Sequence, residues 1–86
     1  MSNYELVPMP GLELVREDYK TNLQYQRNLK RITQKTLSER SGVNVRMIQY
    51  YEQGVKDINK ASGITLYRLA RALNCKVEDL LELDKQ

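Results

Sequence analysis

The 86-residue chain contains no histidine, no tryptophan and no phenylalanine, and it has a single cysteine. It also lacks a cluster of carboxylates at useful spacing and a glycine-rich phosphate loop, so the groups that most enzymes use are missing. The lone Cys75 supports neither a disulfide framework nor a cysteine-based metal site. We therefore expect no enzyme, no bound metal and no cofactor.

Long hydrophobic runs are absent as well. No stretch approaches the roughly 18 apolar residues that a membrane span requires, and the N-terminus lacks the basic and then apolar order of a signal peptide. We therefore expect no membrane association and a location in the reducing cytoplasm. A chain of this length predicts one small domain, without a separate sensor or catalytic domain.

The whole chain has only two prolines and four glycines, and the apolar residues of its body are spaced mostly three and four apart. This spacing is typical of helices, so we expect an all-α domain over residues 19–86. Helices are predicted from residue 19 or 21 to 30, over 34–41 and 45–53, from 60–64 to about 73, and over 77–83. In the loop before the fourth helix, Val55 and Ile58 are expected to point inward.

Residues 1–18, called here the N-terminal arm, follow a different pattern. Two short apolar segments, 4–7 and 12–15, flank Pro8-Met9-Pro10-Gly11, which fits two strands around a turn. Because a lone hairpin is marginal in water, the arm either packs on the helical body, pairs with another chain or stays mobile.

The stretch from residue 33 to 54 has the pattern of two short helices joined by a tight turn. Thr33 is a good N-cap for the first helix, Gly42 supplies a turn with positive φ, and Asn44 can cap the second helix. This order of caps and turn predicts a DNA-binding helix-turn-helix.

On the second helix of this pair, Ile48 and Tyr51 occupy the inward face. Four residues of its N-terminal half are left to point outward as candidate base-reading side chains: Val45, Arg46, Gln49 and Tyr50. Arg46 can bond guanine O6 and N7 together, although a phosphate contact would add affinity without sequence preference. Gln49 suits adenine, Val45 suits a thymine methyl group, and Tyr50 suits a base edge or a phosphate.

The formal net charge of +3 is distributed unevenly. Residues 1–20 carry a net charge of −2, residues 21–56 carry +5, and residues 57–86 are neutral overall. A basic patch alone is usually only a solvated surface. Because this one coincides with the predicted helix pair, it favours nucleic-acid binding.

The chain resembles a known family through Thr33-Gln34-Lys35-Thr36-Leu37-Ser38-Glu39-Arg40-Ser41-Gly42-Val43-Asn44, followed by Ile48, Tyr51-Glu52-Gln53-Gly54, Leu66, Leu69-Ala70, Ala72-Leu73 and Leu80-Leu81. Together these residues resemble the lambda-repressor-like helix-turn-helix family, also called the XRE or Cro/CI family, over about residues 19–83. The resemblance implies a compact five-helix domain whose third helix enters the major groove of double-stranded DNA, commonly as a homodimer on a palindromic operator.

The resemblance also implies roles for single residues. Gln34 matches the family's phosphate-binding glutamine, and Asn44 matches its cap position, from which it can also approach a phosphate. Arg27 and Glu52 match an ion pair that ties the first helix to the third. Further candidates for phosphate contact, each of which could instead be an ordinary exposed charge, are Lys35, Arg40 and Lys56.

Two residues depart from the family pattern. Ser38 stands where the family usually has alanine, and a buried hydroxyl there needs a backbone acceptor one turn back. Gln26 replaces an apolar residue of the first helix. Both departures predict a less stable core or an arm that covers the site.

The sequence thus favours a small transcriptional repressor that binds its operator as a dimer. Three leucines near the C-terminus either close the core or supply a dimer interface: Leu80, Leu81 and Leu83. The alternative is the antitoxin of a toxin–antitoxin pair, which would bind a toxin protein through the N-terminal arm and regulate its own operon.

Overall fold

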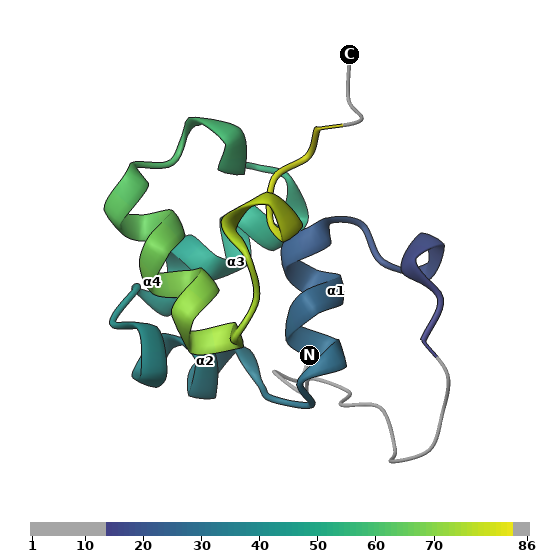
Figure 1. Cartoon of the computed structure of the whole chain (residues 1–86), viewed down its shortest axis with the longest axis horizontal. Helices are drawn as coiled ribbons and strands as arrows, with labels where there is room; N and C mark the ends of the chain where they lie inside the picture. The colour runs from purple at the N-terminus through teal and green to yellow at the C-terminus, as the bar shows by residue number, and fades with distance from the viewer. Residues whose placement is uncertain (1–13, 84–86) are drawn as a thin grey trace.

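The structure, a computed structural model, describes residues 14–83, which form helices joined by loops and turns and contain no strand (Figure 1). Its α-helices are α1 (Asn22–Leu29), α2 (Gln34–Ser41), α3 (Val45–Gln53) and α4 (Gly63–Leu73). Its short 3-10 turns are η1 (Arg16–Asp18), η2 (Ile58–Lys60) and η3 (Val77–Asp79). The predicted all-α class is confirmed, with four α-helices rather than five in the described residues.

Side-chain capping explains where the helices begin. Each N-cap oxygen accepts a hydrogen bond from a first-turn N–H group, and the residues that do so are Thr21, Thr33, Asn44 and Ser62. Three helices end at a residue with positive φ: Gly42, Gly54 and Asn74. The predicted caps Thr33 and Asn44 and the predicted turn at Gly42 are therefore confirmed, because each depends only on its own neighbours along the chain.

The prediction of a fifth helix over 77–83 is wrong, because only the 3-10 turn η3 forms there. Glu82 instead bonds to a distant residue: its N–H donates to Asn59 Oδ1 over 2.8 Å, and its carbonyl accepts from Asn59 Nδ2 over 3.2 Å. These bonds satisfy the backbone of Glu82 outside a helix, and residues 80–83 form turns and a bend.

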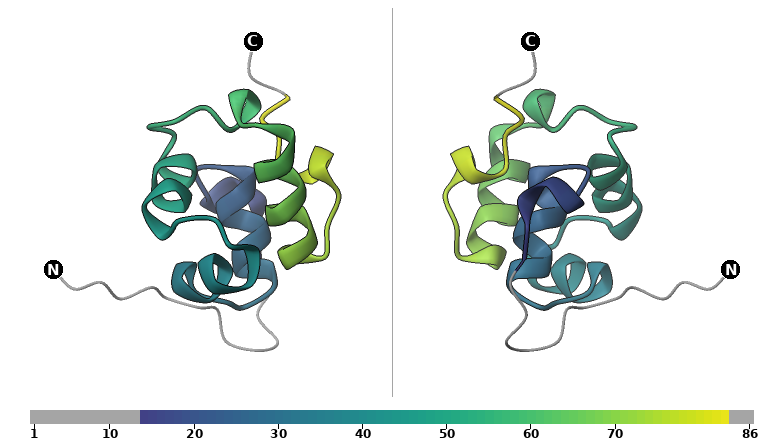
Figure 2. Two further views of the ribbon diagram at one scale, coloured as in Figure 1. Left: turned by 90° about the vertical axis from the view of Figure 1, so that its left-hand side faces the viewer. Right: turned by 90° about the vertical axis from the view of Figure 1, so that its right-hand side faces the viewer.

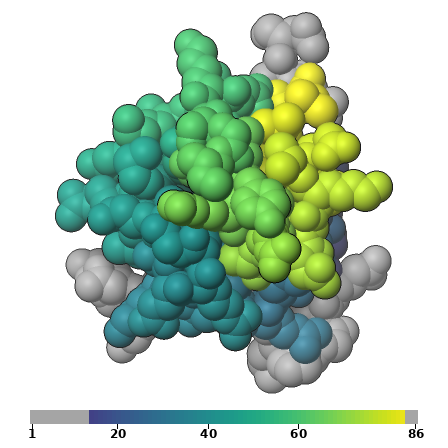
Figure 3. Space-filling view, turned by 60° about the vertical axis from the view of Figure 1, so that its left-hand side comes forward, coloured from purple at the N-terminus to yellow at the C-terminus, as the bar shows by residue number. Residues whose placement is uncertain are grey.

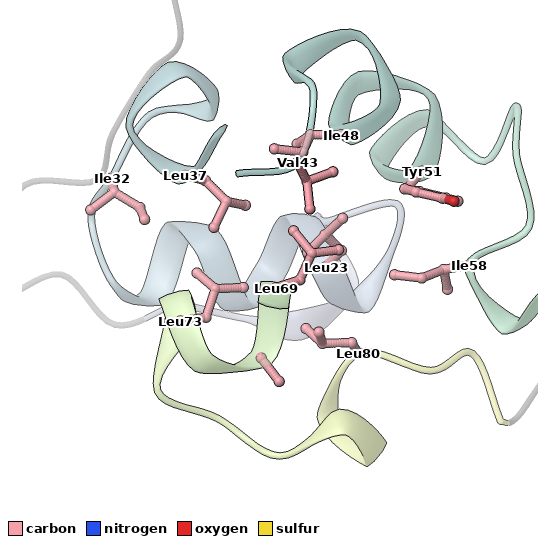
Figure 4. Packing of buried hydrophobic residues seen from close by; sticks show 11 residues of the cluster. Leu23, Ile32, Leu37, Val43, Ile48, Tyr51, Ile58, Leu69, Leu73 and Leu80 are labelled. Atoms are coloured by element: carbon pink, nitrogen blue, oxygen red, sulfur yellow. The ribbon is translucent and has the colours of Figure 1, made fainter. Parts of the chain in front are cut away.

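The core lies where the four helices meet (Figure 4). α2 packs against both α3 and α4, and α1 packs against α3 and η3 (Figure 2). The fully buried aliphatic side chains are Leu23, Leu37, Ile48, Leu69, Leu73 and Leu80. Burial of one such side chain stabilises a fold by about 1.5–3 kcal/mol, so this cluster fixes the relative positions of α2 and α3.

The loop between α3 and η2 differs from its prediction at one position. Ile58 is buried as expected, but Val55 is 67% exposed. The reason lies in the turn that follows α3, where the N–H groups of Val55 and Lys56 both donate to the carbonyl of Tyr50. This tight turn directs Val55 away from the core.

Most of the N-terminal arm lies outside the described residues, including the two predicted strands apart from residues 14 and 15, which are not in a strand. The rest of the arm contains η1. Arg16 Nε donates to Asn22 Oδ1, and Arg16 Nη1 donates to the carbonyl of Tyr19 over 2.7 Å. In residues 14–83 no helix is long and apolar enough to cross a membrane.

Candidate nucleic-acid interface

The turn between α2 and α3 is held by bonds from α2. Ser38 Oγ donates to the carbonyl of Val43 over 2.6 Å, and Ser41 Oγ accepts from the N–H of Val43 over 3.0 Å. The prediction that the Ser38 hydroxyl bonds to a carbonyl one turn back is therefore wrong, because it donates to a carbonyl that follows it in the chain. Since both backbone groups of Val43 are satisfied from α2, the two helices form one rigid unit.

The outward face of α3 carries the four side chains that were expected there. Val45 is 37% exposed and Arg46 is exposed, while Gln49 and Tyr50 are partly exposed. Within residues 14–83, the guanidinium of Arg46 has no hydrogen bond or ion pair. This face is therefore available to a ligand that accepts hydrogen bonds.

Beneath α3 lies a buried ion pair. Arg27 Nε donates to Glu52 Oε2 over 2.6 Å, and Arg27 Nη2 donates to Glu52 Oε1 over 3.0 Å. The side chains of Arg27 and Glu52 are 4% and 1% exposed. The pair joins α1 to α3, and Arg27 Nη1 also donates to the carbonyl of Ile32, so the arginine is not exposed for a ligand.

The same carboxylate positions the start of α2. Gln34 Nε2 donates to Glu52 Oε1 over 2.9 Å, and Thr21 Oγ1 donates to the carbonyl of Glu52 over 3.0 Å. The sequence analysis did not predict the bond between Gln34 and Glu52. It had assigned Gln34 to a phosphate contact and Glu52 to the ion pair with Arg27. The first turn of α2 is thereby fixed relative to α3.

Comparison with known proteins adds one finding. A family model described as helix-turn-helix matches residues 23–80, which is more than half of the chain. The chain belongs to the XRE, or lambda-repressor-like, helix-turn-helix family. This is a family of DNA-binding transcription regulators. Comparisons with curated proteins and with solved structures found no match.

In this helix-turn-helix domain, the candidate phosphate-contacting residues occupy two regions. Gln34 and Lys35 open α2, and Asn44 is exposed at the N-cap of α3, where its Oδ1 accepts from the N–H of Arg46 over 2.7 Å. Lys56 is exposed in the loop after α3. Arg40 is separate from these, because it lies near the other end of α2 and faces α4.

The three C-terminal leucines of the helix-turn-helix domain have different surroundings. Leu80 is completely buried in the core, Leu81 is half-buried, and Leu83 is 59% exposed. Leu80 therefore closes the core and offers no surface to a second chain. Of the three candidates for a dimer interface, Leu81 and Leu83 have exposed area.

The sequence reasoning assigned no role to one exposed basic residue, Arg31. Arg31 lies in the turn between α1 and α2, is exposed, and has φ of 58°, in the left-handed region. A side chain there costs about 1–2 kcal/mol, since Cβ crowds the following carbonyl oxygen. The signal was present as a short connection between helices, residues 30–33 in the structure, since a helix often ends at a left-handed residue.

Proposed function

We propose that the chain represses transcription by binding a palindromic operator as a homodimer, with α3 in the major groove. The observation that carries this proposal is the outward face of α3, where Arg46 is exposed and its guanidinium has no partner within residues 14–83. A guanidinium in the major groove can donate two hydrogen bonds to O6 and N7 of a guanine, which discriminates against other bases by about 1–3 kcal/mol.

The phosphate contacts would come from the residues that flank α3. Gln34 and Lys35 at the start of α2, Asn44 before α3, and Lys56 after it lie along the helix-turn-helix. If a dimer made about 6–10 phosphate contacts, its affinity would fall by about 10³–10⁵-fold between about 50 and 200 mM salt. A much flatter dependence would contradict this proposal.

The experiment is a selection of bound sequences from a random duplex library at one fixed salt concentration. We expect the wild type to enrich a two-fold symmetric motif, and Arg46→Ala to lose a guanine preference within it. Arg68→Ala is the matched control, because Arg68 is also an exposed arginine but lies on α4. It is expected to enrich the same motif as the wild type.

Two results would overturn the proposal. If the wild type enriched no motif, a protein partner such as a toxin would become the favoured target. If Arg46→Ala kept the full motif, base recognition would lie elsewhere on the domain. Repression itself is tested by placing the selected motif over a reporter promoter, where the wild type should lower transcription and Arg46→Ala should not.

A further inference from the structure

A shallow groove of about 320 Å³ lies between the C-terminal part of α2 and the outer side of α4. It is lined by Arg40, Ser41, Tyr67, Arg68, Arg71 and Ala72. We call it the arginine groove. Figure 3 shows the side of the molecule on which the side chains of α4, in green, meet those of α2 and α3, in teal. No residue of α3 lines the groove, so it is distinct from the outward face of α3.

No acidic residue lines the arginine groove to neutralise its positive charge. Three of the lining residues are arginines. Within residues 14–83, neither Arg40 nor Arg68 forms an ion pair. Arg71 Nη1 donates to the hydroxyl of Tyr67 over 3.3 Å, and its guanidinium lies 5.7 Å from the centre of the Tyr67 ring. The groove therefore favours an anionic ligand.

Exposed apolar surface continues from the groove along α4. Ile64 is 55% exposed and Tyr67 is 52% exposed, and their spacing places them with Arg68 and Arg71 on one side of the helix. Tyrosine and arginine together are enriched where proteins bind one another. The occupant that fits this surface carries both acidic and apolar side chains.

DNA fits the arginine groove less well. Arg40 follows Gln34 by six positions on α2, which is about 9 Å along a helix axis, so the groove is at the far end of α2 from the proposed phosphate contact. A phosphate backbone would also leave Ile64 without an apolar partner.

We propose that the arginine groove binds an acidic segment of a partner protein. Carboxylates of the segment pair with Arg40, Arg68 and Arg71, and an apolar side chain of the segment packs against Ile64 and Tyr67. Because the groove and the outward face of α3 share no residue, the segment and DNA can be bound at the same time. A partner that docks there would be recruited to the operator.

The test uses a fluorescein-labelled peptide of glutamate and aspartate residues with two leucines, and a second peptide in which the acids are replaced by their amides. Binding to the full chain is followed by fluorescence anisotropy at fixed salt, and the contacts are mapped by backbone NMR shifts. We expect the acidic peptide to bind and the amide peptide not to bind. The shifted signals should lie at the C-terminal part of α2 and along α4.

Two double variants with the same net charge separate the groove from general electrostatic attraction. The double variant Arg68→Glu with Arg71→Glu reverses the charge of two groove residues. It should weaken peptide binding by at least about tenfold, because like charges would then face each other. The double variant Lys60→Glu with Lys76→Glu reverses the charge of two exposed lysines that do not line the groove. It should change peptide binding by no more than about twofold. Circular dichroism checks that both variants fold, as expected from the exposure of all four residues.

The inference is overturned if the two double variants weaken peptide binding equally, or if the shifted signals lie on the outward face of α3. It is also overturned if the groove variant loses operator binding and keeps peptide binding, since the groove would then contact phosphates. The same variants are assayed on operator DNA, so a failure of the proposed repressor function is recognised separately.

Discussion

Gln34 Nε2 donates a hydrogen bond of 2.9 Å to Glu52 Oε1, which joins the first residue of α2 to the last turn of α3. Glu52 is only 1% exposed, and Arg27 neutralises its charge through two further hydrogen bonds. One buried carboxylate therefore holds α1, α2 and α3 in a fixed arrangement. The proposed phosphate contact of Gln34 depends on this carboxylate as much as on Gln34 itself.

We predict that Glu52→Ala lowers the free energy of unfolding by about 3–5 kcal/mol, because Arg27 would remain buried without a counter-charge. Urea denaturation monitored by circular dichroism measures the change.

Two controls separate this effect from a general loss of charge. Glu39→Ala removes an exposed carboxylate of α2 and should change stability by no more than about 0.5 kcal/mol. The double variant Arg27→Met with Glu52→Leu should recover most of the loss, because it leaves no charge unpaired. A loss below about 1 kcal/mol in Glu52→Ala would contradict the prediction.

Arg31→Gly is expected to stabilise the domain by about 1 kcal/mol, because glycine adopts the left-handed conformation of this turn without a steric cost. Arg31→Ala is the matched control, since it removes the same charge and keeps the Cβ. Thermal unfolding of the two variants side by side measures the difference. Equal melting temperatures would mean that the turn does not hold this conformation in solution.

The proposed homodimer is tested at Leu83, which is 59% exposed. If Leu83 lies in the dimer interface, Leu83→Glu should yield monomers in sedimentation experiments, because a charge would be buried against an apolar surface. Leu29→Glu places the same charge on a leucine that is 39% exposed at the end of α1, whereas the Leu81–Glu82 segment contacts Asn22 at the start of that helix. It should leave the sedimentation of the protein unchanged, and a monomer in the wild type would refute the dimer.

Cys75 is half-buried, and burial, followed by the nearby charge of Asp79, raises its pKa to about 11, while Lys30 acts in the opposite direction. Its ordinary value here is 9.0, so at pH 8 alkylation of the folded chain should be roughly a hundredfold slower than that of the unfolded chain. The unfolded thiol ionises first as the pH rises. Stability should therefore fall between about pH 9 and pH 11, and Cys75→Ser should reduce this loss. Equal alkylation rates in both states would contradict the raised pKa.

Local features of the fold could be predicted from the sequence. The hydrogen bonds of Thr33, Gly42 and Asn44 reach residues only two to four positions away. These three residues therefore determine where α2 begins and ends and where α3 begins. The family resemblance pointed to Arg27 and Glu52 as a pair, and the structure contains this ion pair.

Features that depend on distant contacts could not be predicted. The segment after η3 has leucines at helical spacing, yet Asn59 binds the backbone of Glu82 and prevents a helix. The arginine groove likewise combines Arg40 with Arg68 and Arg71, which only the packing of α2 against α4 brings together. In the sequence these three residues are simply exposed charges.

The carboxylate of Glu82 accepts a hydrogen bond of 2.5 Å from the N–H of Asn22, sixty positions earlier in the chain, and the carbonyl of Leu81 accepts from Asn22 Nδ2 over 2.7 Å. The first turn of a helix normally frays, and its amides then exchange with solvent quickly. Here the opening of α1 requires the release of the segment that follows η3. Hydrogen exchange at Asn22 thus reports the opening of both segments as one cooperative event.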